Sequence, residues 1–168
     1  MSPGASGGFS LIELVVVIVL AGFLAWIAYP TMTGHQEVKL DAAARRLASD
    51  LRYAQSQALS RRVIHGILFE PASRRYTVFA PDPSAPLTDP VDRSKPLRVD
   101  YASSHEYSGV TIASATFGAT PGIKFDYFGV PRDTAGIDLA TPGLVILAIG
   151  ALRDTVEVTP ETGVVTVR

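Results

Sequence analysis

One apolar stretch near the N-terminus constrains the fold of this 168-residue chain more than any other feature. From Phe9 to Tyr29 the sequence reads FSLIELVVVIVLAGFLAWIAY, in which Glu13 is the one charged residue. As an α-helix at ~1.5 Å per residue, this stretch reaches ~31 Å, about the hydrocarbon thickness of a bilayer. We therefore predict a transmembrane helix over residues 9–29.

A secretory signal peptide is the first alternative for this stretch, and it fits poorly. Such a peptide needs a basic segment before a shorter apolar run and an A-x-A-like cleavage site. Residues 1–8, MSPGASGG, contain no Lys or Arg, and Ala25 and Ala28 have the wrong spacing for that site. A plain single-pass anchor fits better, but it leaves Glu13 unexplained.

Glu13 indicates a function beyond anchoring. A carboxylate inside a bilayer segment costs roughly 2.5–3.5 kcal/mol on insertion scales, so it normally has a role and a partner. The alternative is a glutamate near the interface whose carboxylate reaches the headgroups.

Residues 30–62 predict an amphipathic continuation of the helix. Pro30 is expected to kink or interrupt it, because proline removes a backbone donor and crowds the preceding turn. Beyond Pro30 the chain is rich in Ala, Leu, Gln and Arg, which favour helix. Apolar residues recur at steps of four and three, which predicts one stripe that packs on a head domain. This stripe comprises Leu40, Ala44, Leu47, Leu51, Ala54 and Ala58, whereas Asp41, Arg45, Arg46, Asp50, Arg52, Gln55 and Arg62 lie mostly off it.

Residues 63–168 predict a β-rich head. Apolar and polar residues alternate from Val63 onward, and short apolar runs are separated by turns that contain Pro or Gly. Strands are expected near 64–69, 76–78, 97–101, 110–113, 123–127, 144–149, 154–158 and 164–167. The proline-rich segment 80–96 is expected to be a long surface loop. The fold class is thus α+β, with a long N-terminal helix packed on a mostly antiparallel, β-sandwich-like head.

Composition argues against several function classes. The chain contains no Cys, and its formal net charge is −1. Residues 35–62 carry six basic and three acidic side chains, and residues 63–168 carry nine basic and twelve acidic ones. A basic stem with a slightly acidic head favours protein–protein assembly, so no nucleic-acid partner is expected.

No catalytic or metal-binding motif appears in the sequence. His35, His65 and His105 are far apart, and Asp82, Asp89 and Asp92 lack the spacing and glycine of a Ca²⁺ loop. We expect no enzyme activity, no metal, no cofactor and no small-molecule substrate. An anchored enzyme or a solute-binding head stays an alternative, and it would require a pocket with convergent polar groups.

The N-terminus resembles the type IV prepilin signal. Gly8-Phe9-Ser10-Leu11-Ile12-Glu13, followed by the apolar helix, is similar to the pattern G then F-[ST]-L-x-E. The resemblance implies that residues 1–8 are a leader, that prepilin peptidase cuts between Gly8 and Phe9, and that Phe9 is N-methylated. Glu13 then matches the assembly glutamate, and Pro30 matches the helix-kinking proline. Because the leader has no Lys or Arg, a cytoplasmic N-terminus rests on the resemblance alone.

Four further segments are distinctive: LRYAQSQAL at 51–59, a predicted strand that ends in FEP at 69–71, FDYFGVP at 125–131 and VTPETGVV at 158–165. Together they look like the type II secretion protein H family, which also contains T-type fimbrial minor pilins. Gly129 and Gly163 in these segments suit turns with positive φ.

Membership of this family would imply a minor pseudopilin, a structural subunit of the type II secretion pseudopilus that contributes to tip formation, assembly and protein export across the outer membrane. It would sit in the bacterial inner membrane with its head in the periplasm, in contact with lipid and other pilin-like subunits. A minor pilin of a type IV pilus is the alternative. A DNA-uptake pilin would need a basic tract, which the acidic head lacks.

Overall fold

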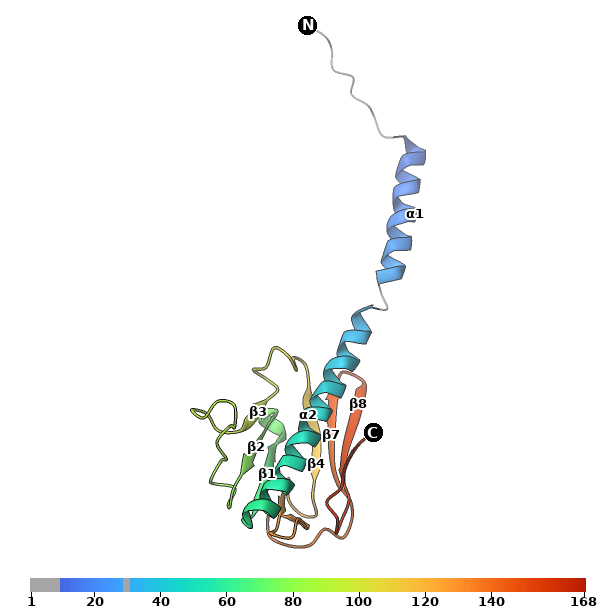
Figure 1. Ribbon diagram of the computed structural model, residues 1–168. Helices are drawn as coiled ribbons and strands as arrows, with labels where there is room; N and C mark the ends of the chain where they lie inside the picture. The colour runs from blue at the N-terminus through green and yellow to red at the C-terminus, as the bar shows by residue number, and fades with distance from the viewer. Residues whose placement is uncertain (1–9, 29–30) are drawn as a thin grey trace. The chain divides into compact units, whose positions relative to one another are not determined.

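The computed structural model describes residues 10–28 and 31–168 of the chain (Figure 1). The chain divides into two compact units between Gln36 and Glu37. The N-terminal unit holds α1 (Leu11–Ala28) and the start of α2 (Thr31–Arg61), and the second unit holds the rest of α2 and every described strand.

Helix α1 begins directly after Ser10. The carbonyl of Ser10 accepts hydrogen bonds from the backbone N–H groups of Glu13, at 3.0 Å, and Leu14, at 3.1 Å. The helix accounts for residues 11–28 of the apolar segment 9–29. Within the part of the chain that the structure describes, no helix combines the length and the apolar character needed to cross a membrane.

Helix α2 buries one face in the head. All six residues of the predicted stripe are buried, and so are Ala43 and Ala48, which widen it. The helix ends at Arg61, and Arg62 follows with a positive φ of 54°.

The head contains two antiparallel sheets, and α2 lies across both of them (Figure 1). The first sheet has the order β3-β2-β1-β5-β6 and consists of β1 (His65–Glu70), β2 (Arg75–Phe79), β3 (Arg98–Asp100), β5 (Gly122–Phe125) and β6 (Pro131–Asp133). The second sheet has the order β4-β7-β8-β9 and consists of β4 (Thr111–Thr116), β7 (Gly143–Ile149), β8 (Leu152–Val158) and β9 (Val165–Val167). The 3-10 turn η1 (Pro71–Ser73) links β1 to β2.

A hydrophobic core joins α2 to both sheets. It includes Leu47 and Leu51 of α2, Ile67 of the first sheet, and Val145 and Val156 of the second, each fully buried. The prediction of an α+β chain with an N-terminal helix and antiparallel sheets is confirmed. The predicted strands all occur near their expected positions, whereas β6 was not predicted.

The proline at the start of strand β6 explains why the sequence did not predict this strand. Pro131 cannot donate to a strand ladder, so proline is tolerated in a sheet mainly at an edge. Strand β6 is the edge strand of the first sheet, and Pro131 lies opposite Phe125 of β5. A three-residue edge strand that begins with proline has almost no sequence pattern by which it could be found.

Candidate assembly site

Glu13 lies in the first turn of α1, and its side chain is exposed. An acidic side chain is favourable there, because the unpaired N–H groups of the first turn give that end of a helix a partial positive charge. Ser10 and Glu13 also have the S-x-x-E spacing of a capping box. Local helix chemistry therefore tolerates a carboxylate at this position and leaves it accessible to a partner.

The other predicted site residues lie outside the described residues. Gly8 and Phe9, at the expected cut, precede the described part of the chain, and Pro30, the expected kink, falls between α1 and α2. Cleavage, N-methylation and the kink stay predictions.

The surface of α1 is apolar on every side. Within the α1 unit, Leu11 is 82% exposed and Trp26 is 76% exposed, and the Val, Ile and Leu side chains between them are exposed as well. A helix that is hydrophobic all round normally lies in a protein core or a membrane. Since water is a poor solvent for so much apolar surface, α1 needs a cover from outside its own unit.

Three of the four family-like segments, at 51–59, 125–131 and 158–165, meet at Gln55 of α2. Its Nε2 donates to the carbonyl of Gly129, at 3.0 Å, and to the carbonyl of Thr162, at 2.9 Å. Gly129 lies in the turn from β5 to β6, and Thr162 lies in the turn from β8 to β9. One amide group therefore ties the helix to a turn of each sheet.

The glycines of these two turns are required by their backbone. Gly129 has a φ of 78° and Gly163 has a φ of 67°, as the sequence predicted. A Cβ atom on Gly163 would also lie 2.4 Å from Nε2 of Gln55, so a side chain there would displace that amide group. Arg52 adds a further tie, because its guanidinium donates to the carbonyl of Val165 at 2.7 Å. We call Gln55, Arg52 and these two turns the helix joint.

Asp50 belongs to the group of residues expected to lie mostly off the apolar stripe of α2, yet its side chain is buried. Its Oδ2 accepts hydrogen bonds from the Tyr76 hydroxyl, at 2.7 Å, and from Nε of Arg46, at 3.1 Å. Burial raises the pKa of Tyr76 well above its ordinary value, and the nearby Tyr101 and Asp50 raise it further. A partnered carboxylate can thus lie in the core where a helical pattern predicts a solvated one.

Asp82, Asp89 and Asp92 each accept hydrogen bonds from neighbouring residues of the loop between β2 and β3. Asp82 accepts from the backbone and hydroxyl of Ser84, and Asp92 accepts in the same way from Ser94. The hydroxyl of Ser94, the ammonium of Lys95 and the Ser94 N–H lower the pKa of Asp92 to about 2. Within residues 10–28 and 31–168, no three His, Asp or Glu side chains gather in a group that could hold a metal.

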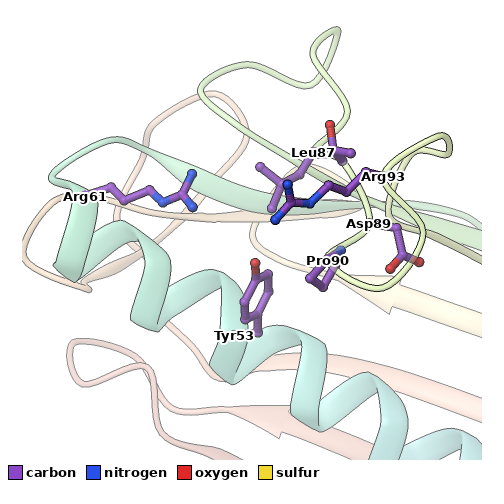
Figure 2. Close-up of a pocket in the computed structure, with 7 residues that line it drawn as sticks. Tyr53, Arg61, Leu87, Asp89, Pro90 and Arg93 are labelled. Carbon is purple, nitrogen blue, oxygen red and sulfur yellow. The ribbon is translucent and has the colours of Figure 1, made fainter.

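An open pocket of about 450 Å³ lies between the same loop and α2. Tyr53 and Arg61 of α2 form one wall, and Leu87, Asp89, Pro90 and Arg93 of the loop form the other (Figure 2). No sequence motif indicated this pocket, because its walls are far apart in the chain.

Comparisons with known proteins agree with this architecture. The model of the family of type II transport protein GspH matches residues 43–162, and the model of the prokaryotic N-terminal methylation motif matches residues 4–29. No curated protein matches the chain significantly.

Two solved structures share the fold. The minor pseudopilin EpsH from the type 2 secretion system of Vibrio cholerae is 12% identical, with a TM-score of 0.55 over 77% of this chain and 96% of that chain. The type IV minor pilin FimU of Pseudomonas aeruginosa is 17% identical, with a TM-score of 0.50 over 77% of this chain and 92% of that chain. At these identities the two likenesses show the fold alone.

Proposed function

Since the chain belongs to the family of type II transport protein GspH, we propose that it works as a minor pseudopilin of a type II secretion system. In this role it is a structural subunit that helps to form the pseudopilus tip and supports protein export across the outer membrane. The observation that carries the proposal is the family match over residues 43–162, joined to a methylation motif at 4–29.

Maturation follows from the N-terminal motif. Prepilin peptidase removes residues 1–8 by cutting between Gly8 and Phe9, and it methylates the new amine of Phe9. Residues 9–29 hold the subunit in the inner membrane before assembly, with the head in the periplasm. The exposed apolar surface of α1 supports this part of the proposal, because lipid or neighbouring helices would cover it.

Glu13 fixes the axial register between neighbouring subunits of the assembled filament. Cleavage creates an α-ammonium on Phe9, and the Glu13 carboxylate of one subunit pairs with the Phe9 ammonium of a neighbour. In the low-dielectric interior of a helix bundle such a pair is poorly screened, and either charge alone would be unfavourable. The exposed position of Glu13 in the first turn of α1 supports the pairing.

Substitution of Glu13 tests the proposal. Glu13→Val should insert into the membrane at least as well as the wild type, because the carboxylate costs roughly a few kcal/mol there. Mass spectrometry should show loss of residues 1–8 and gain of one methyl group in both proteins. Crosslinking to partner pseudopilins and complementation of secretion should fall about tenfold or more, as expected for an unpaired buried charge.

Glu13→Asp is the matched control, because it keeps the charge and should retain measurable crosslinking and secretion. The charge-pairing mechanism is wrong if Glu13→Val is processed, crosslinks and complements as well as the wild type. An uncleaved chain, or a cut near Ala28, would contradict the prepilin assignment.

A minor pilin of a type IV pilus is the second candidate, because the FimU structure shares the fold. Complementation separates the two candidates. Rescue of piliation with no effect on secretion would favour the pilus, and neighbouring genes for a secretion ATPase and outer-membrane channel would favour the pseudopilus.

A further inference from the structure

The pocket between α2 and the loop is lined by two arginines that face each other. Figure 2 shows the guanidinium of Arg61 and that of Arg93 reaching toward each other above the ring of Tyr53. Both arginine side chains are exposed, while the Tyr53 ring is half-buried against the core. The pocket thus has a cationic rim and an aromatic floor.

Neither arginine has an anionic partner among the described residues. Arg45, Arg46, Arg75, Arg132 and Arg168 form ion pairs within the described part of the chain, but Arg61 and Arg93 form none there. The Asp89 carboxylate, which also lines the pocket, accepts from the backbone N–H of Val91 at 2.7 Å and of Asp92 at 3.3 Å. Its Oδ1 atom is therefore engaged within its own turn.

The loop that carries Arg93 is held in place by backbone hydrogen bonds. Leu87 donates to the carbonyl of Val78 at 2.8 Å, and Leu97 donates to the carbonyl of Leu87 at 2.6 Å. Asp89 donates to the carbonyl of Lys95 at 2.9 Å, which closes the turn around Arg93. The second wall is thus preorganised, which lowers the entropic cost of binding.

We propose that this pocket binds a glutamate or aspartate side chain presented by an acidic segment of a partner subunit. Two guanidinium groups match a carboxylate well, because each offers a planar set of N–H donors. Asp89 reduces the positive charge of the lining, which favours a singly charged carboxylate over a phosphate dianion. Tyr53, Leu87 and Pro90 supply apolar surface for the rest of the partner segment.

The identity of the occupant as a subunit rests on the proposed function, whereas its carboxylate chemistry rests on the pocket alone. The test therefore uses the full chain in detergent and a synthetic probe. The probe is a fluorescein-labelled peptide that contains two glutamates, compared with the same peptide carrying glutamines and with inorganic phosphate as competitor.

We expect saturable binding of the glutamate peptide by fluorescence polarisation. The double variant Arg61→Gln with Arg93→Gln should raise Kd by at least about tenfold, as for the loss of two charge-assisted contacts. The matched control, Arg74→Gln with Arg153→Gln, removes the same charge from exposed arginines outside the pocket. It should change Kd by less than about twofold, because distant surface charges are screened.

The proposal would be overturned by equal weakening by the control pair, by equal binding of the glutamine peptide, or by displacement of the peptide by phosphate at equal concentration. Arg93→Gln alone, on the loop, serves if the double variant fails to fold, and it should still weaken binding. If the chain assembles and supports secretion but does not bind the peptide, only the proposed ligand of this pocket is overturned. If Glu13→Val crosslinks and complements like the wild type, only the proposed function is affected.

Discussion

Helices α1 and α2 follow each other in sequence, yet their apolar side chains differ sharply in exposure. Within its own unit, α1 leaves apolar side chains exposed around its whole circumference, as at Leu20. Helix α2 buries one stripe completely, as at Leu47 and Leu51, and keeps charged side chains on its other face. Folding of the head thus stabilises α2, whereas the apolar surface of α1 is left uncovered within its own unit.

The largest expected effect tests this division directly. Leu51→Ala should lower the free energy of unfolding of the head by ~2–5 kcal/mol, because it leaves a cavity between α2 and the sheets. Leu20→Ala, the same truncation in α1, should change it by less than about 0.5 kcal/mol. Urea unfolding of the full chain in detergent, followed by the near-ultraviolet circular dichroism of the buried tyrosines, measures both. Equal destabilisation by the two variants would show that α1 belongs to the cooperative unit of the head.

A smaller effect sharpens the account of how α2 is held. Gln55→Ala should cost ~1–3 kcal/mol, because it leaves the carbonyls of Gly129 and Thr162 without their side-chain donor. Gln57→Ala is the control, since the Gln57 side chain makes no hydrogen bond to the described residues. Comparable unfolding midpoints for the two variants would mean that the helix joint contributes nothing beyond helix propensity.

The smallest expected effect concerns the other exposed part of the molecule, the loop between β2 and β3. Side chains of this loop accept hydrogen bonds from its own backbone and hydroxyl groups, so its order should depend on pH. The pKa of Asp92 is lowered to about 2 from an ordinary value near 3.8. The contribution of the Asp92 carboxylate to the stability of the loop is therefore fully present above pH 3.8, and it is lost as the pH falls toward about 2.

The Ser94 amide resonance in an NMR titration follows this change. Its midpoint should lie near 2, and Ser94→Ala should move the Asp92 titration upward, because the hydroxyl that favours the carboxylate is gone. A midpoint that stays near 3.8 in the wild type would contradict the role of Ser94.

Local patterns predicted most of the head. The apolar stripe of α2 follows from helical spacing, and its six predicted residues are all buried. The glycines at 129 and 163 were recognised as positive-φ positions because no other residue adopts that backbone as easily. Periodicity and turn chemistry are local properties, so they can be read without knowledge of the partners in space.

The sequence by itself determined the order of the helices and of every strand but β6, the apolar helix with its single carboxylate at Glu13, and the face of α2 that packs on the head. Only the tertiary structure decided that Asp50 is buried against Tyr76, that Gln55 joins two turns more than seventy residues away, and that Arg61 and Arg93 line one pocket. The physical reason is that these contacts join residues far apart in the chain. Whether a polar side chain is solvated or partnered depends on what the fold brings beside it, and no local pattern encodes that neighbour.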